Sequence, residues 1–415
     1  MNLRRSAAAL AAVAVIGTAT PAVAAGPSPS ASPSPVIPDG LYGRTDPTYD
    51  GVWRQSLTLL AQDTVGVKPA IAAVDWLTGQ QCANGAFAAF RADTAEPCGA
   101  GLVVDTNSTA AAVQALAALG GHDAATGKAV TWLKSVQNAD GGWGYTPGGA
   151  SDANSTSVVI GALAAAGGDP KDVRKGGRSP YDALLKLALP CDGDGDGAGA
   201  FAYQPDKKGR LTANADATAA AVLGALGKGL AGDDARPDAA PPACGRADGP
   251  GQAAHNGAAY LRTALAKDKH LTQELPGAKP QPDYGNTADA VVALATVGQG
   301  DRAADSLRWL ETHYEQWAKQ SGPAAYAQLI LAANAEGSDP RHFGGQDLVR
   351  LMDATGPAPA SVPDAKGSEP HGSEDAAKSD KDEGPLRVAW IVGACLLALT
   401  AGGILYTSRG GRRQP

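Results

Sequence analysis

A carboxylate or amide side chain, followed four residues later by threonine, opens four Ala-rich segments of the chain. Successive threonines are 47, 62 and 69 residues apart, so the unit repeats while the connections differ in length. Two carboxylates brought together by such a repeat could serve as general acid and base, as in glycoside hydrolysis. Alternatively, each Asp or Asn caps a helix, which stabilises it by about 1 kcal/mol. The copies begin at Asp105, Asp152, Asn214 and Asp283 and reach Thr109, Thr156, Thr218 and Thr287.

If these helices surround one centre, their N-termini lie at a common mouth. Helix N-termini favour a polar or anionic group, since they carry partial positive charge and free N–H groups. The Asp side chains partly cancel this field and favour hydrogen bonding over charge capture. Aromatic residues nearby would form apolar walls or pack in the core. The candidate ligand-binding residues are Asp105, Thr109, Trp143, Tyr145, Asp152, Asn154, Thr156, Tyr203, Asn214, Asp216, Asp283, Tyr284 and Asn286.

A second acidic pattern is typical of metal binding. Asp192, Asp194 and Asp196 alternate with glycine, as at the start of an EF-hand calcium loop. The twelfth position is Tyr203, so the bidentate glutamate of such a loop is missing. Both calcium binding and a flexible Gly/Asp loop remain open. The six histidines do not fall at zinc-ligand spacing, and no nucleophile elbow, phosphate-binding loop or His-Glu-x-x-His motif occurs.

The cysteines predict disulfide bonds, and the net charge bears on the class of binding partner. Of five cysteines, one lies in an apolar C-terminal run, and the other four are expected to pair by proximity as Cys82–Cys98 and Cys191–Cys244. The formal net charge of −7 argues against nucleic acid as a partner.

Both ends of the chain predict export and anchoring. Residues 1–25 have the basic start, short apolar core and small-residue cleavage site of a signal peptide. Residues 387–406 are the predicted transmembrane helix, because the uncharged run from Val388 to Leu405 is long enough to cross a membrane. The basic tail 407–415 places the C-terminus in the cytoplasm. Linkers at 26–46 (Pro/Ser-rich) and 356–386 flank a domain at 47–355. We therefore expect a single-pass cell-membrane protein with an extracellular N-terminal domain.

Two kinds of helix alternate through this domain, six of each, which predicts an all-α fold: an α6/α6 toroid of inner and outer helices, plus one C-terminal transmembrane helix. An open solenoid is the alternative. Small residues suit a crowded inner layer, and amphipathic helices suit an outer one. The expected inner helices are 53–62, 106–119, 155–166, 216–229, 286–297 and 323–335; the outer ones are 69–78, 127–135, 179–189, 252–266, 301–320 and 344–354.

The segment from Gln137 to Trp143, QNADGGW, resembles the Gln–Trp repeat of the squalene cyclase and protein prenyltransferase superfamily, with a weaker copy from Gln81 to Phe87. The resemblance covers roughly residues 47–355 and implies the toroid. The Asp-x-Asp-Asp motif of the cyclases and the zinc ligands of the prenyltransferases are absent. Asp105-Thr106 and the segment that starts at Phe343 are similar to the cobalamin carriers, intrinsic factor and transcobalamin, although the β-rich second domain of those carriers is missing.

Intact repeats without a catalytic motif favour binding over catalysis. The sequence predicts a membrane-anchored toroid that binds a bulky ligand such as a corrinoid (cobalamin), for uptake with a membrane transporter as partner. The alternative is an extracytoplasmic enzyme of the terpenoid cyclase or prenyltransferase type, acting on an isoprenoid or lipid-linked substrate. A structural or protein-interaction module is the third hypothesis.

Overall fold

The computed structural model describes residues 37–192, 197–233, 242–273 and 279–363, all within one compact unit of the chain. The predicted signal peptide, transmembrane helix and basic tail lie outside these residues, as do Asp194 and Asp196. In the described part of the chain, no helix is long and apolar enough to cross a membrane.

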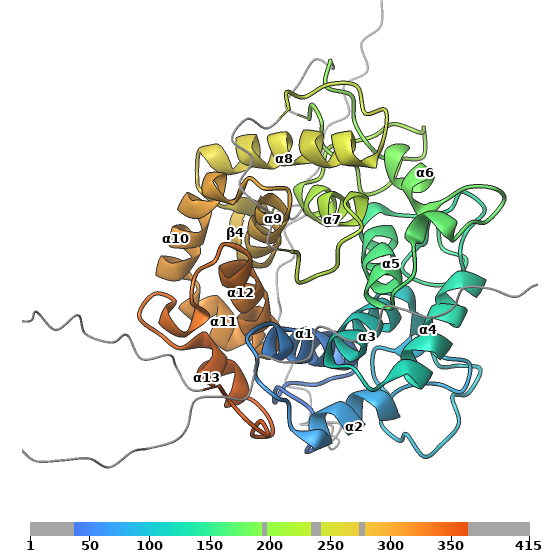
Figure 1. The fold of residues 1–415 in the computed structure, drawn as a ribbon, viewed down its shortest axis with the longest axis vertical. Helices are drawn as coiled ribbons and strands as arrows, with labels where there is room; N and C mark the ends of the chain where they lie inside the picture. Colours follow the sequence, from blue (N-terminus) through green and yellow to red (C-terminus); the bar gives the residue numbers. More distant parts are fainter. Residues whose placement is uncertain (1–36, 193–196, 234–241, 274–278, 364–415) are drawn as a thin grey trace, which may run out of the picture. The chain divides into compact units, whose positions relative to one another are not determined.

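Among the described residues, six helices form an inner ring, and all but α1 are rich in alanine (Figure 1). Each contacts the next along the chain, and the last contacts the first, so the ring is closed and the open solenoid is excluded. Close packing requires small residues: a Cβ on Gly224 would lie 2.7 Å from the Cβ of Ser157 on the neighbouring helix. The inner helices are α1 (Gly51–Thr64), α3 (Thr106–Leu119), α5 (Ala153–Ala165), α7 (Ala215–Ala225), α9 (Tyr284–Thr296) and α12 (Pro323–Ala335).

The outer layer packs against this ring, each helix against the inner helix that precedes it, except α11, which packs against α12, the inner helix that follows it (Figure 1). The predicted outer helix at 301–320 is divided at Tyr314, and those at 179–189 and 344–354 are shorter than predicted. The outer helices are α2 (Ile71–Gly79), α4 (Asp123–Ser135), α6 (Pro180–Leu185), α8 (Pro250–Ala266), α10 (Ala304–His313), α11 (Glu315–Ser321) and α13 (Leu348–Asp353), with short 3-10 turns η1 (Pro170–Asp172), η2 (Gly300–Arg302) and η3 (Pro340–His342).

Within the described ranges, two short antiparallel hairpins, which the sequence analysis did not predict, lead into inner helices. β1 (Phe87–Ala88) pairs with β2 (Val104–Asp105) before α3, and β3 (Leu271–Gln273) pairs with β4 (Gln281–Asp283) before α9. Strands of two or three residues are too short to show a recognisable alternation. They fix the backbone at the start of the helices that they precede.

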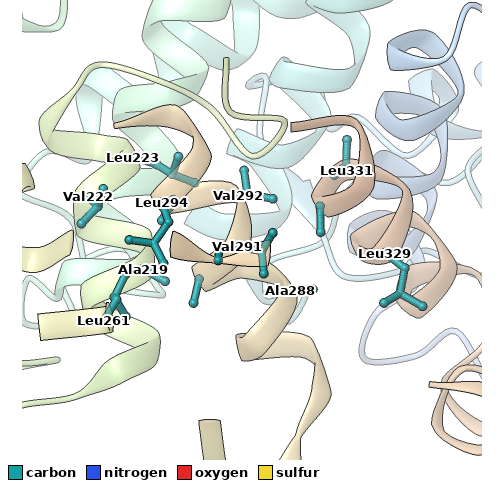
Figure 2. Close-up of a cluster of buried hydrophobic side chains, with 14 of the residues drawn as sticks. Ala219, Val222, Leu223, Leu261, Ala288, Val291, Val292, Leu294, Leu329 and Leu331 are labelled. Atoms are coloured by element: carbon teal, nitrogen blue, oxygen red, sulfur yellow. The ribbon is translucent and has the colours of Figure 1, made fainter. Parts of the chain in front are cut away.

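The core lies between the two layers. Figure 2 shows part of it, where side chains of α7, α8, α9 and α12 meet. Val222, Leu294 and Leu329 are among its buried members. The inner helices therefore bury their outward faces against the outer layer, which leaves their inward faces to line the centre of the ring.

The domain is longer than the predicted 47–355. Leu41 and Tyr42, in the segment expected to be a linker, are buried, and the Tyr42 hydroxyl donates a hydrogen bond of 2.9 Å to the Pro357 carbonyl. Ser361, in the second expected linker, forms an isolated antiparallel β-bridge with Lys68. The two segments thus fasten the ends of the ring to each other, because a buried Tyr at one end meets backbone at the other.

The Gln–aromatic segments join neighbouring repeats. The Gln137 side-chain amide donates hydrogen bonds to the carbonyls of Gly141 at 2.8 Å and Val173 at 3.1 Å. Gly141 has φ +94°, and a Cβ there would collide with the backbone carbonyl of Ser179. The motif is therefore a structural tie between one repeat and the next.

Both predicted disulfides, Cys82–Cys98 and Cys191–Cys244, are present.

Candidate functional site

The repeated Asp and Asn residues are helix caps. The Asp105 carboxylate accepts the Ser108 N–H at 2.6 Å. Asp152 accepts from Ser155 at 2.7 Å, Asn214 from Ala217 at 2.7 Å, and Asp283 from Asn286 at 3.2 Å. The Asn286 side chain also donates to Asp283 at 2.7 Å. Burial raises the pKa of Asp105 and Asp152, and the hydrogen bonds at the caps oppose this shift.

The repeated threonines are structural too. Each hydroxyl accepts the backbone N–H of a residue that follows the preceding turn: Thr109 from Phe87 at 2.9 Å, and Thr156 from Trp143 at 3.1 Å. The Thr218 and Thr287 hydroxyls do the same for Phe201 and Leu271, each at 2.9 Å. All four threonines are completely buried. These hydroxyls lock each inner helix to the turn before it and are occupied within the protein.

Trp143 is also a core residue, since it is buried and its indole N–H donates to the Leu133 carbonyl at 2.8 Å. Tyr145 and Tyr203 lie at the starts of α3 and α5, where their carbonyls accept the N–H groups of Thr106 and Ala153. Tyr145 and Tyr203 are 49% and 43% exposed. Of the candidate aromatic residues, these two remain available at the mouth together with the half-buried Tyr284.

Inside the ring is a cavity of about 170 Å³, which we call the cup. Half of its lining follows a simple register: the second residue of α3, α5 and α7 faces it, and so does the sixth residue of α5, α7 and α9. Positions four apart share one face of a helix. The lining comprises Trp53, Asn107, Asn154, Ser157, Val158, Asp216, Ala220, Leu223, Lys228, Gly229, Leu230 and Asp289.

Two amide–carboxylate pairs link neighbouring inner helices at the cup. The Asn154 amide of α5 donates to Asp216 of α7 at 2.8 Å. The Gln328 amide of α12 donates to both oxygens of Asp289 of α9, at 3.2 and 3.1 Å. The first pair joins second positions and the second pair joins sixth positions of adjacent helices. Each carboxylate is therefore held in place by one amide.

The position of Asp289 strongly perturbs its ionisation. Burial within the ring, supported by the negative charges of Asp216 and Asp283, raises the pKa of Asp289 from 3.8 to about 7. The hydrogen bond from Gln328 opposes the shift without cancelling it. Burial also raises the pKa of Asp216. Asp289 keeps some accessible surface, which faces the cup. A carboxyl that titrates near neutral pH beside a cavity is a common feature of functional sites.

Several buried polar atoms of the lining lack a hydrogen-bond partner. They are the side-chain oxygens of Asn107 and Asn154 and the hydroxyl of Ser157, a residue that is only 4% exposed. A buried polar atom without a partner costs about 1–3 kcal/mol, so proteins seldom leave several of them together. A bound molecule could satisfy these atoms.

The floor of the cup is the segment 227–233, which follows α7. Gln114 of α3 holds it: its side-chain oxygen accepts the Leu230 N–H at 2.7 Å, and its amide donates to the Val158 carbonyl at 2.9 Å. The N–H of Asp233 donates to the Thr296 hydroxyl at 3.2 Å. Since Thr296 is the last residue of α9, this segment covers the C-terminal end of the ring, and the cup opens toward the helix N-termini.

The predicted calcium loop is only partly described, because Asp192 is placed and Asp194 and Asp196 are not. Over the described ranges, no group of three or more His, Cys, Asp or Glu residues could hold a metal ion. Calcium binding at this loop stays a prediction.

Of the residues predicted from the sequence, Asn154 and Asp216 line the cup, whereas the caps and threonines stabilise the fold. The sequence analysis missed Asn107, Ser157, Asp289 and Gln328. Asp289 was detectable as an acidic residue inside an otherwise small and apolar helix, two residues after Thr287.

No family model matches the chain, and no curated protein matches it. Among solved structures, ent-copalyl diphosphate synthase from Streptomyces platensis is 17% identical with a TM-score of 0.44, over 69% of this chain and 50% of the synthase. The chain thus spans about half the length of that enzyme. A protein from Actinoplanes is 16% identical with a TM-score of 0.47, over 73% of this chain and 96% of that protein.

Proposed function

We propose that this chain is a binding protein of the cell surface, whose toroid takes up a small ligand in the cup. The observation that carries the proposal is the set of unpartnered polar atoms of Asn107, Asn154 and Ser157 on the wall of an internal cavity. Small-molecule sites typically combine apolar walls with a few convergent polar groups. Val158, Leu223 and Leu230 supply the apolar part of this wall.

Anchoring at the membrane belongs to the same proposal. A signal peptide at 1–25 would export the domain, and a span at 387–406 would retain it, within reach of a transporter that receives the ligand. Disulfide bonds persist mainly in oxidising, extracytoplasmic compartments, and the two pairs here support such a location.

The volume of the cup limits the size of ligand that can bind inside it. At about 170 Å³ it is below the roughly 300–1,000 Å³ of sites for drug-sized molecules. A corrinoid is larger than a drug-sized molecule and does not fit inside. We therefore propose a slim ligand, or a slim end of a longer one, in place of the corrinoid that the resemblance to cobalamin carriers implied.

The test is thermal unfolding of the purified full-length chain with 1-hexanol, hexanoate, hexylamine or cobinamide. A ligand that binds only the folded state raises the midpoint in proportion to its affinity. Ala220→Phe fills the cup from α7, whereas Ala124→Phe adds the same ring on the exposed face of α4. We expect a slim probe to stabilise the wild type and Ala124→Phe but not Ala220→Phe. Equal stabilisation of all three chains, or of none, rejects the proposal.

A second candidate is acid catalysis of the cyclase type, and Asp289 favours it. With a pKa of about 7, its carboxylic acid is partly protonated at neutral pH and could transfer that proton to a double bond, leaving a carboxylate and a carbocation. This candidate predicts conversion of a short isoprenoid into a cyclised product and its loss in Asp289→Asn. Unchanged isoprenoid after prolonged incubation with the wild type rejects it.

A further inference from the structure

We propose that the cup takes an organic cation, a primary alkylammonium that enters with its N–H donors first. The proposal rests on the binding function proposed above and adds the chemical class of the ligand. It depends on which polar atoms of the lining are already occupied and on the charges around them.

Two amides at the polar wall donate within the protein, whereas two amide carbonyl oxygens of the wall accept no hydrogen bond. The Asn154 amide donates to Asp216, and the Gln328 amide donates to Asp289. The unpartnered atoms include the carbonyl oxygens of Asn107 and Asn154, which can only accept. The Ser157 hydroxyl can donate or accept. A ligand that satisfies these atoms must therefore bring hydrogen-bond donors.

The charges favour the same class. Asp216 and Asp289 face the cup, and Asp283 lies close enough for its charge to raise the pKa of both. Lys228, the one cationic residue among the described residues that line the cup, forms an ion pair with Asp233 and has 42% of its side chain exposed. An anionic ligand would be repelled, whereas a cation would compensate the two half-buried carboxylates. A metal ion is not the cation proposed here, since among the residues that the structure describes no group of three His, Cys, Asp or Glu residues could hold a metal ion.

The walls suit a slim apolar body with a cationic head. Trp53 contributes an aromatic ring to the lining, and such rings attract ammonium groups. At the rim, a Cβ on Gly285 would lie 3.3 Å from the side-chain oxygen of Gln328 and 3.6 Å from the ring of Trp317. The Trp317 ring stacks on Tyr284 with centroids 5.4 Å apart. An apolar chain that leaves the cup can therefore continue along an aromatic surface.

The test compares hexylammonium, 1-hexanol and hexanoate by calorimetry on the purified full-length chain. These probes share a hexyl body and differ in the charge and donors of the head. At pH 8 we expect hexylammonium to bind at least tenfold more tightly than either of the others. Asp289→Asn should weaken hexylammonium at least tenfold and leave 1-hexanol unchanged. Asp75→Asn, an exposed helical substitution on α2, should change neither.

The pH dependence gives an independent check. Asp289 faces Asp216, Asp283 and Gln328, with Lys228 at the floor. Since its pKa is about 7, its ionised fraction rises from about a tenth at pH 6 to about nine tenths at pH 8, while an alkylammonium stays charged. Hexylammonium should therefore bind up to about tenfold more tightly at pH 8.

The outcomes of these experiments distinguish failure of the proposed ligand class from failure of the proposed binding function. If 1-hexanol or hexanoate occupies the cup as tightly as hexylammonium, as judged by loss in Ala220→Phe, the ligand class is wrong and the binding function stands. If no probe binds the wild type, both are rejected. Hexylammonium binding that Asp289→Asn leaves intact also overturns the ligand class.

Discussion

Replacing Asp289 by asparagine should make the folded chain more stable at pH 8, although the side chain lies inside the ring. In the folded chain this carboxyl keeps its proton until about pH 7, whereas its ordinary pKa is 3.8. Unfolding between these values releases a proton, so the stability from this group falls as pH rises from about 4 to 7 and is lost above 7. Asparagine keeps an oxygen for the Gln328 amide and removes the charge.

The magnitude follows from the pKa. A rise from 3.8 to about 7, at about 1.4 kcal/mol for each tenfold change in the equilibrium, corresponds to about 4 kcal/mol. Solvent in the cup screens part of this, and we expect about 2 kcal/mol at pH 8. For a domain of this size that is roughly 4 °C in the unfolding midpoint. Glu336, whose pKa burial also raises to about 7, remains in both chains and cancels in the comparison.

The assay is guanidinium denaturation of wild type, Asp289→Asn and the exposed control Asp75→Asn at pH 4.5 and pH 8. The benefit of Asp289→Asn should shrink to less than half at pH 4.5, because the wild-type carboxyl is then protonated in the folded state. The control should show no gain at either pH. An Asp289→Asn chain that is less stable than wild type at pH 8, or equally improved at both pH values, refutes the reasoning.

Three further predictions concern the scaffold. Thr218→Val should lower the free energy of unfolding by about 1–3 kcal/mol, because it leaves the Phe201 N–H buried without an acceptor; the exposed Thr263→Val should change it by less than about 0.5 kcal/mol in chemical denaturation. Gln114→Ala should increase hydrogen exchange across residues 227–233, and unchanged exchange there would contradict its role in holding the floor. Removing the Cys191–Cys244 disulfide, whose cysteines are 53 residues apart, should lower the free energy of unfolding by about 1 kcal/mol more than removing Cys82–Cys98, with a separation of 16. Equal losses of stability in the two double Cys→Ser variants would contradict this prediction.

The fold was largely predictable because its determinants are local. Residues 106–119 and 323–335 were predicted as helices and match α3 and α12 to the residue. Ala-rich stretches with polar caps and Gly or Pro stops define such helices without any tertiary information. The two hairpins were missed because strands of two or three residues show no recognisable alternation, and the division of the helix at Tyr314 was missed as well. The closure of the ring was inferred from the number of helix pairs, and it is confirmed by the packing of α12 against α1.

The site was predictable only in part. Asn154 and Asp216 were found because they follow conspicuous caps, yet they entered the candidate set for the mouth and lie in the cup. Asp289 was missed because its neighbours in sequence give no sign of Gln328, which is 39 residues away on α12. The caps attracted attention because they repeat, although repetition in a ring reflects the packing that every copy must satisfy.

That distinction supports the cup as the functional part of the ring. The capping position is Asp or Asn in four repeats, and threonine recurs four residues later because its hydroxyl locks each inner helix to the preceding turn. The inward positions beside them differ from copy to copy. A role in the fold alone would favour the same small residue each time, since each copy meets the same packing. Instead the side chains divide into amides, acids and apolar residues, which is what an asymmetric ligand requires of a symmetric scaffold. The second positions of α3, α5, α7 and α9 are Asn107, Asn154, Asp216 and Gly285, and the sixth positions are Ala111, Val158, Ala220 and Asp289.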